Sequence, residues 1–414
     1  MTMTEPTTGT RSATPSGTVR LLAAGADAGY EAHLRTFGPL PARDPRAMME
    51  QVEASRLTGR GGAGFPAWRK LAAAAQAGAH RRRGRAPILI ANGSEGEPLS
   101  WKDRVLLENA PHLVIDGMIA AARTIGARNV LLYVSRDALP AVERAAGARA
   151  DARGIEIVEA ADSFIAGEAS AVVNAIENDD PRPVDRTARL TESGLRGRPT
   201  LVQNVETLAH VGLIARYGGA WFRSVGSPED PGTRLVTVTG EVPRAGVFEV
   251  AADAPVDGVL AAAGVDVAAC AAVLVGGYHG AWLPAAALGT RLVPGELSRF
   301  GAQPGAGVLH VLGADRCGLD ATAEIVDYLA GQTARQCGPC MFGLPTLATR
   351  FAALARGEAA EESARELARV SDLIVGRGAC HHPDGSVRLI RSALRVFQSD
   401  VRAHARGRCT RRPL

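Results

Sequence analysis

A glycine-rich segment, 59–66 (Gly-Arg-Gly-Gly-Ala-Gly-Phe-Pro), places four glycines directly before a stretch that we expect to begin a helix. Glycine lets a backbone approach a ligand closely, and the free amides of a helix start, with Lys70 nearby, favour a phosphate. Further on, the apolar run 87–91 ends at the polar segment 92–98, Asn-Gly-Ser-Glu-Gly-Glu-Pro. In α/β proteins, ligands bind at the carboxyl ends of buried strands. The two segments together therefore predict a nucleotide-like cofactor at the edge of a sheet.

Strand-like and helical segments alternate through the first half of the chain. We expect apolar strands at 87–91, 129–134 and 154–158, and helical segments at 103–125, as one helix or a pair, and 138–150. This β-α-β-α-β order predicts an α/β fold with a largely parallel sheet covered by helices.

The turn-rich segment 226–232 marks a boundary after this first unit. Segments 234–240 and 247–250 then read as a hairpin, and a helix at 256–263 and a strand at 272–275 complete a small α+β unit. We expect this unit to be a packing module without chemistry of its own.

From residue 315 onward the apolar residues fall at helical spacing in four segments, 321–330, 344–355, 360–373 and 387–403, which are enough for a small bundle. The expected divisions are a tail at 1–18, an α/β domain at 19–228, an α+β domain at 229–300, a helical domain at 301–405 and a basic tail at 406–414.

Length and composition exclude several classes of protein. A chain of 414 residues is expected to form two or three domains. No apolar run approaches the roughly 20 residues of a membrane span, so we expect no transmembrane segment. The amino-terminal stretch 1–17 lacks the apolar core of a signal peptide. We therefore expect a cytoplasmic protein, with a peripheral position on a membrane complex left open.

The positive charge is local, because the net charge is only +4 while arginines gather at 81–85 and 402–412. With 4% aromatic residues and no binding motif near these clusters, we expect no nucleic-acid partner. Solvated surface is the simpler interpretation of the clusters. A docking face for an acidic redox partner such as a ferredoxin is the alternative.

Three of the six cysteines are candidate metal ligands. Cys337-Gly-Pro-Cys340 enters one expected helix and Cys380 lies between two others, so these thiols could converge. Thiolates suit zinc or an iron–sulfur cluster, which normally takes four ligands. His381 or His382, beside Cys380, is the nearest fourth candidate. A four-iron cluster, a three-iron cluster, zinc held as Cys₃His and no metal at all remain open. We expect the other three cysteines to be inert or incidental: Cys270, Cys317 and Cys409.

In order along the chain, these motifs resemble the FMN- and NADH-binding flavoprotein subunit of respiratory complex I, a family shared with NAD-linked hydrogenases and formate dehydrogenases. The family's glycine turn and following lysine match 59–66 and Lys70, and its N-x-D-E-x-E-P strand end and K-D-R match 92–98 and 102–104. Gly167-Glu168, the segment 197–207 and the late cysteine-rich stretch match as well, so that the resemblance runs from about Tyr30 to Phe397.

The resemblance implies an FMN-binding domain, a ubiquitin-like α+β domain and a helical iron–sulfur domain. It implies that the FMN phosphate and ribityl chain are held by Gly59, Arg60, Gly61, Gly62, Gly64 and Lys70. It implies that the ring side is lined by Asn92, Ser94, Glu95, Gly167, Glu168, Gln203, Asn204 and Thr207. Phe65 would face the adenine of NADH, and the candidate catalytic residues are Glu97 and Glu168. The structural alternatives are helix-entry caps for Glu95 and Glu97 and turn residues for Gln203 and Asn204.

The chain departs from the family at its metal and flavin positions. Ala334 stands where the family has the first cysteine of C-x-x-C-x-x-C, so the cluster, [4Fe–4S] or [3Fe–4S], would be held by Cys337, Cys340 and Cys380, with His381 as the candidate fourth ligand. Ser94 replaces an Asp and Gln203 an Asn, and both can still form hydrogen bonds.

The nicotinamide site departs further. Ala73 and Arg189 replace two aromatic residues, and Ala169 replaces a glutamate. Because stacking is worth roughly a kilocalorie per mole per pair, these losses would weaken NADH binding by about one to two orders of magnitude. Arg186 and Arg189 could compensate by pairing with phosphates and could favour NADPH.

The leading hypothesis is therefore a subunit that oxidises NAD(P)H through FMN and passes electrons through the cluster to a ferredoxin, another redox subunit or a quinone-reducing complex. One alternative is an FMN and cluster module reduced by a protein donor, without NADH. The other is a cofactor-free scaffold.

Overall fold

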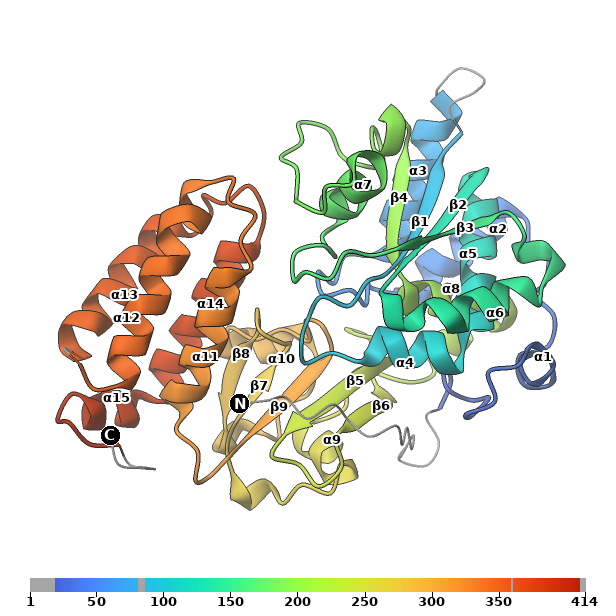
Figure 1. Cartoon of the computed structure of the whole chain (residues 1–414). Helices are drawn as coiled ribbons and strands as arrows, with labels where there is room; N and C mark the ends of the chain where they lie inside the picture. Colours follow the sequence, from blue (N-terminus) through green and yellow to red (C-terminus); the bar gives the residue numbers. More distant parts are fainter. Residues whose placement is uncertain (1–18, 81–85, 359, 410–414) are drawn as a thin grey trace.

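The chain folds into a parallel sheet covered by helices, a second mixed sheet and a helical bundle, as Figure 1 shows for this computed structural model. The structure describes residues 19–80, 86–358 and 360–409. The expected tail 1–18, the basic cluster 81–85 and the end of the basic tail, 410–414, lie outside the described residues.

The first sheet contains four parallel strands in the order β3-β2-β1-β4. They are β1 (Ile88–Gly93), β2 (Asn129–Val134), β3 (Ile155–Glu159) and β4 (Thr200–Asn204). The central strand β1 is buried almost throughout, as the apolar run predicted. From β1 the chain moves outward through β2 to β3 and then returns to the other side of β1. The topological switch, where α/β proteins bind ligands, therefore lies between β1 and β4.

The helices of this part are α1 (Tyr30–Phe37), α2 (Pro45–Ser55), α3 (Ala67–His80), α4 (Lys102–Asn109), α5 (Pro111–Ile125), α6 (Leu139–Gly147), α7 (Ala169–Asn178) and α8 (Val205–Phe222). The segment expected as one helix or a pair is a pair, because the chain breaks at Ala110 before Pro111. Helices α5 and α8 touch backbone to backbone at Gly117, where a Cβ atom would come within 1.7 Å of the Leu208 carbonyl oxygen.

Among the described helices, none alone has the length and hydropathy needed to cross a membrane. The pair α4–α5 meets that test only when its two helices, bent by 96°, are taken together.

The second sheet has the order β6-β5-β9-β7-β8. Its strands are β5 (Thr233–Gly240), β6 (Gly246–Ala251), β7 (Cys270–Val275), β8 (Ala281–Pro284) and β9 (Val308–Gly313), with helices α9 (Val256–Ala262) and α10 (Pro294–Leu297) beside them. The expected hairpin is the antiparallel pair β5–β6. Strand β9 is the middle of the sheet, so this unit extends beyond the expected boundary at residue 300. A short apolar run such as β9 does not reveal from its own periodicity which unit it joins.

The bundle consists of α11 (Gly318–Gly331), α12 (Leu344–Ala355), α13 (Ala360–Ile374), α14 (His382–Val396) and α15 (Gln398–His404). The segment expected as one helix at 387–403 is divided at Phe397, whose side chain is buried. Trp282 of β8 attaches the bundle to the second sheet, because its backbone N–H donates to Ser392 Oγ (3.0 Å) and its indole N–H to Thr322 Oγ1 (3.0 Å).

Candidate functional site

The polar ends of β1 and β4 meet at the topological switch. Asn92 of β1 lies opposite Asn204 of β4 in the strand register. The Asn92 amide nitrogen donates to the Gly167 carbonyl oxygen at 2.9 Å, and its side-chain oxygen accepts from the Ser94 hydroxyl at 2.8 Å. Three segments that are far apart in the sequence therefore meet at the carboxyl ends of β1 and β4, a place that we call the crevice after the usual ligand position in α/β sheets. The sequence predicted all four of these residues for the site.

The glycine loop closes one side of this crevice. Gly59 donates to the Phe65 carbonyl oxygen at 2.9 Å, which folds the loop back on itself. Gly62 and Gly64 have φ angles of +108° and +61°, which side-chain-bearing residues rarely adopt. A Cβ atom at Gly61 would lie 3.0 Å from Asn204 Cβ. The glycines therefore let the loop backbone approach the end of β4. The Phe65 ring remains 43% exposed at the rim.

Arg60 holds the loop rather than reaching into the crevice. Its guanidinium is buried and donates to Asp230 Oδ1 at 2.8 Å and to the Pro231 carbonyl oxygen at 3.0 Å. Its backbone N–H donates to Thr207 Oγ1 at 2.8 Å. These donors are engaged within the protein. The buried guanidinium thus fixes the loop through a carboxylate partner, while its Nε makes no hydrogen bond with a described residue. A contact of Arg60 with a phosphate stays a prediction.

Lys70 is the cation that is left for a ligand. It lies in the first turn of α3, and its ammonium makes no hydrogen bond or ion pair with any residue that the structure describes. Burial lowers its pKa, and the nearby Glu168 carboxylate raises it. The chain contains only two lysines, Lys70 and Lys102, beside 45 arginines. A partly buried ammonium at a helix start, next to a glycine loop, fits a phosphate.

Glu95 and Glu168 cap helices. Both Glu95 carboxylate oxygens accept backbone N–H groups at the start of α4, from Asp103 (3.0 Å) and Arg104 (3.1 Å). The Glu168 carboxylate accepts from the Ser170 N–H at 2.8 Å at the start of α7. Glu95 therefore has the helix-cap role rather than a place on the ring side. Glu168 combines its cap with a position close to Lys70. Gln203, in register with Ala91, is buried at the end of β4.

A buried ion network lies directly beneath the crevice. Lys102 Nζ is 2.6 Å from Asp103 Oδ1 and 2.9 Å from Glu206 Oε2, and all three side chains are less than 7% exposed. Asn204 donates to Asp103 Oδ2 at 2.6 Å, which links the network to the floor of the site. Burial raises the pKa of Asp103 to about 7, although Lys102 opposes that shift. The Lys-Asp pair was expected only as a sequence match, and Glu206 was not expected in the network at all.

Glu97 lies where the first and second sheets meet. Its carboxylate accepts the backbone N–H of Tyr278 at 2.8 Å, in the loop between β7 and β8. Gly277, with φ of +88°, makes room for it, since a Cβ atom there would be 2.5 Å from Glu97 Oε2. Burial raises the pKa of Glu97 to about 7, against the two backbone hydrogen bonds. At neutral pH this carboxyl can therefore hold or release a proton.

Cys340 lies beside Cys337, and Cys380 is near enough to act on it, but the three sulfur atoms do not all lie within 4.8 Å of one another. Burial raises the pKa of Cys340 to about 11, and the neighbouring Cys337 and Cys380 thiols raise it further. Cys340 lies in a π-helical turn, Pro339–Gly343, that leads into α12. The Glu168 carboxylate is close enough to raise the pKa of Cys380. One face of the crevice therefore borders the thiols.

The two histidines beside Cys380 have other surroundings. The His381 side chain is fully exposed, and its Nδ1 is 3.6 Å from Asp384. His382 is buried, with Nδ1 3.0 Å from His279 Nε2 and Nε2 2.9 Å from the Leu329 carbonyl oxygen. Both nitrogens of His382 are therefore engaged. The structure corrects the expected fourth ligand, because His381 extends into solvent. The side chain that hydrogen-bonds to Cys340 is that of Thr333, not that of a histidine.

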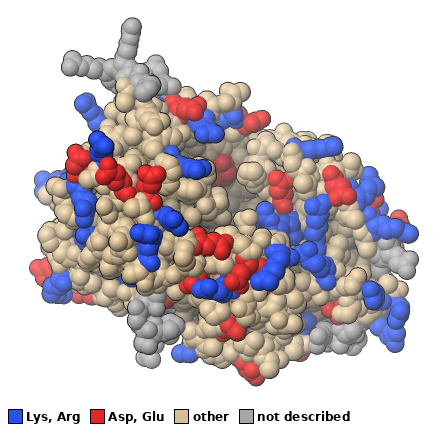
Figure 2. Space-filling model, turned by 180° about the vertical axis from the view of Figure 1, so that it is seen from behind, with Lys and Arg blue, Asp and Glu red and all other residues tan. Residues whose placement is uncertain are grey.

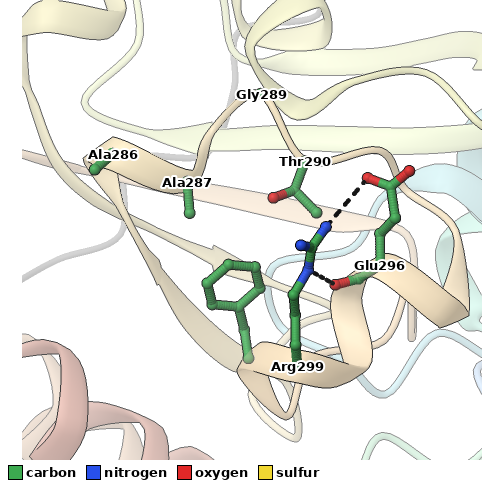
Figure 3. Close-up of a pocket in the computed structure, with 7 residues that line it drawn as sticks. Ala286, Ala287, Gly289, Thr290, Glu296 and Arg299 are labelled. Atoms are coloured by element: carbon green, nitrogen blue, oxygen red, sulfur yellow. Dashed lines mark hydrogen bonds and ion pairs between the residues drawn. The ribbon is translucent and has the colours of Figure 1, made fainter.

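A hollow of about 340 Å³ on the second sheet is a different feature (Figure 3). Its lining contains none of the expected site residues, and Arg299 in it donates to the Glu296 carbonyl oxygen at 3.0 Å.

Viewed from behind, the molecule is hollowed between its two lobes, and acidic and basic side chains are mixed over this face (Figure 2).

Sequence reasoning missed a second group of sulfur and nitrogen ligands. The Cys317, His404 and Cys409 ligand atoms all lie within 4.8 Å of one another. Nothing in the sequence places Cys317 and Cys409 together, and the expectation that they are inert or incidental stays untested. Intervals of 87 and 5 residues match no metal motif, so only the fold could reveal the group.

Two family models match the chain. The "Nuo51 FMN-binding domain" matches residues 52–213, and the "NADH-ubiquinone oxidoreductase-F iron-sulfur binding region" matches residues 320–404. The first match contains the glycine loop and the ends of β1 and β4. The second contains the three thiols of the bundle.

Among curated proteins, the chain is 28% identical over 402 residues to an F-type subunit of the NADH-quinone oxidoreductase of Rhizobium meliloti (strain 1021), covering 92% of this chain and 94% of that one. It is 30% identical to the NAD-reducing hydrogenase HoxS subunit alpha of Cupriavidus necator, covering 89% of this chain and 64% of that one.

Among solved structures, a chain of the air-oxidised NAD+-reducing [NiFe]-hydrogenase superposes with a TM-score of 0.82 at 31% identity, covering 93% of this chain and 67% of that one. The H2-reduced form gives 0.79 at 32% identity, covering 87% and 63%. The chain thus spans about two thirds of the hydrogenase chains.

Proposed function

The chain belongs to the family of FMN- and NADH-binding flavoprotein subunits of respiratory complex I and its hydrogenase relatives, and on this premise we propose that it oxidises a nicotinamide nucleotide and delivers the electrons to a partner protein. The observation that carries the proposal is that the glycine loop, the polar ends of β1 and β4 and the turn before α7 meet at the topological switch, with Cys380 near Glu168.

The described residues fit FMN at the crevice. The glycine loop leaves backbone room where a Cβ atom at Gly61 would press on Asn204. Lys70 supplies an ammonium for the phosphate, and this ammonium makes no hydrogen bond or ion pair with a described residue. Asn92 and Ser94, held by each other and by Gly167, present polar groups toward the ring side. When bound, FMN supplies hydride acceptance from the nicotinamide and one-electron release.

Glu97 and Glu168 have separate roles in this proposal. Glu97, with its pKa raised to about 7, holds a proton at the border of the crevice and releases it as the pH rises. Glu168 places a fixed carboxylate between Lys70 and Cys380. The Glu97 carboxylate is held in place by the hydrogen bond that it accepts from the Tyr278 backbone. The Glu168 carboxylate is held by its cap on α7.

The thiols fit an iron–sulfur cluster held by Cys337, Cys340 and Cys380, which would supply one-electron transfer. Ala334 offers no ligand atom, and its side chain is buried. The chain therefore provides three thiolates and no histidine at this position, and we propose a three-iron cluster, or a four-iron cluster with one iron open to an external ligand.

The next part of the proposal concerns the nicotinamide nucleotide that donates the electrons. Phe65 keeps an exposed ring for stacking on adenine. The buried Nε of Arg186 makes no hydrogen bond with any described residue, and the Arg189 side chain is exposed. Pairing of Arg186 and Arg189 with phosphates would favour a nucleotide with an additional phosphate, and we propose NADPH as a donor alongside NADH.

The flavin part is tested by binding. The protein is purified anaerobically, stripped of flavin and titrated with FMN by fluorescence quenching. Lys70→Ala removes a charged hydrogen-bond donor worth about 1.5–3 kcal/mol, so its Kd should rise about tenfold to a hundredfold. Arg69→Ala, a neighbouring exposed cation on the same helix, is the matched control and should bind like wild type. An unchanged Kd for Lys70→Ala would remove Lys70 from the site.

Because the chain has only two lysines, chemical labelling gives a second measure. Lys102 is buried in its ion network, so a lysine-reactive ester should modify Lys70 and the terminal amine only. Saturating FMN should protect Lys70 and leave the terminal amine reactive. Equal labelling of Lys70 with and without FMN contradicts the proposed position of the phosphate.

The donor is tested on the flavin-loaded protein. Addition of NADH or NADPH without oxygen should bleach the absorbance near 450 nm, roughly where flavins absorb. The second candidate function, a module reduced by a protein donor, is favoured by Ala73 and Arg189, which remove two stacking faces. Bleaching by a reduced ferredoxin but by neither nucleotide would select it. A colourless preparation without iron would select the scaffold.

A further inference from the structure

A second cluster of potential metal ligands lies at the other end of helix α11 from the iron–sulfur cysteines. Cys317 is the N-cap of α11, whereas Cys337 follows its C-terminal end. Fourteen helical residues separate the two ends, a length of roughly 20 Å. In Figure 1 the short helix α15 lies beside α11, and the two helices are in contact. The two cysteine groups are therefore separate sites.

Three ligand atoms meet there, one from the beginning of the bundle's sequence and two from its end. Cys317 is buried, His404 is the last residue of α15 and is completely buried, and Cys409 is partly buried against the bundle core. His404 Nε2 is 3.7 Å from Cys317 Sγ, and the three ligand atoms all lie within 4.8 Å of one another. Ligands that share one tetrahedral zinc ion are separated by roughly 3.5–3.8 Å, as follows from Zn–S and Zn–N bond lengths.

The His404 imidazole is poorly satisfied without an ion. His404 Nδ1 makes no hydrogen bond with any described residue, and the polar contact of Nε2 is to sulfur, a weak partner. Buried imidazoles are usually hydrogen-bonded or bound to a metal. His112 and His210 also have buried ring nitrogens without a hydrogen bond to a described residue, and what distinguishes His404 is the two cysteine sulfurs beside it.

We propose that Cys317, His404 and Cys409 form a binding site for a tetrahedral zinc ion, with the fourth position filled by water or an external ligand. Two sulfurs and one imidazole are a ligand set that zinc prefers. Binding displaces the two thiol protons and forms two Zn–S bonds and one Zn–N bond, without any change of oxidation state.

The ion would link the beginning of the bundle's sequence to its end. Cys317 and Cys409 enclose 91 residues, among them all three iron–sulfur cysteines. A link that closes so long a loop restricts the unfolded chain strongly. Cys317 and Cys409 also lie outside the matched iron–sulfur region, 320–404. The site is therefore an addition to that region and does not depend on the flavin.

The test is the metal content of the full-length chain, purified anaerobically with zinc in the medium, with zinc and iron measured together. We expect about one zinc ion per chain in the wild type. Cys409→Ser, a change near the terminus at a partly buried position, should lower zinc at least tenfold and leave iron unchanged. Cys270→Ser, another buried cysteine, is the matched control and should keep the zinc.

Cys337→Ser separates this proposal from the proposed function, because it should reduce iron and keep zinc. Cobalt in place of zinc should give the visible bands of a tetrahedral thiolate site, absent in Cys409→Ser. A wild-type protein without zinc overturns the proposal whether or not the variants fold. So does a mass lower by two hydrogens from a Cys317–Cys409 disulfide, or zinc that is retained in Cys409→Ser and lost in Cys337→Ser.

Discussion

Replacing Lys102 by methionine should show how strongly the buried network beneath the crevice depends on its one cation. Methionine has nearly the same length and leaves the apolar part of the packing in place. The change removes ion pairs of 2.6 Å to Asp103 and 2.9 Å to Glu206. Both carboxylates stay buried, and Glu206 Oε1 still accepts the backbone N–H of Leu235 at 2.9 Å.

Removing one partner of a buried ion pair costs about 3–5 kcal/mol, because a buried charge is left uncompensated. For a cooperative unit of about 200 residues, each kcal/mol shifts Tm by about 2–4 °C, so Tm should fall by roughly 6–20 °C. The pKa of Asp103 is already raised to about 7 by burial, and loss of Lys102 raises it further. A carboxyl with a raised folded pKa contributes stability that is present below its unfolded pKa and is lost as the pH rises through the folded value. The deficit of the variant should therefore be small near pH 4 and should still be growing above pH 7, because Asp103 of the variant ionises only above the wild-type value.

The assay is chemical denaturation of wild type and variant between pH 4 and 9, followed by tryptophan fluorescence. Arg104→Ala is the control, because Arg104 is the adjacent cation, about half exposed, and its loss should cost at most about 1 kcal/mol. The triple variant with Asp103→Asn and Glu206→Gln added should regain much of the loss. A deficit of Lys102→Met below about 1 kcal/mol at pH 8 would refute the reasoning.

Three further changes test the crevice. Glu97→Gln should remove a pH dependence in which wild-type stability declines from about pH 4.5 to 7, since the folded pKa is raised to about 7; the variant should gain up to ~3 kcal/mol over wild type at pH 8, and parallel denaturation curves at pH 5 and 8 would contradict this. Gly61→Ala should cost about 1–3 kcal/mol and weaken FMN binding, because its Cβ atom would press on Asn204, whereas Gly64→Ala has open space and should cost about 1–2 kcal/mol of backbone strain alone; equal FMN affinities in the two variants would argue against close approach. Arg60→Lys should lower Tm and loosen FMN binding indirectly, because an ammonium cannot reproduce the buried fork of hydrogen bonds; calorimetry and flavin titration check both effects, and a wild-type Tm would show that the fork is not needed.

The sequence predicted local structure well where the physical cause is local. The apolar run at β1 and the hairpin β5–β6 follow from side-chain pattern and turn chemistry, whereas the sequence left open whether 103–125 forms one helix or a pair. The division between the second sheet and the bundle did not, because β9 is a short apolar run whose neighbours are set by long-range pairing. For the same reason the helix expected through Phe397 is broken, since that ring is drawn into the core.

The sequence by itself determined which chemistry the chain carries: a glycine loop with Lys70, polar ends on two buried strands, and three thiols with Ala334 in place of a fourth. Only the tertiary structure decided which side chains are free to use it. Arg60 and Glu95 carry suitable charges, yet burial commits the first to Asp230 and the start of α4 occupies the second. The physical reason is that a buried charge must find a partner, and the identity of that partner depends on packing between segments that are distant in the chain.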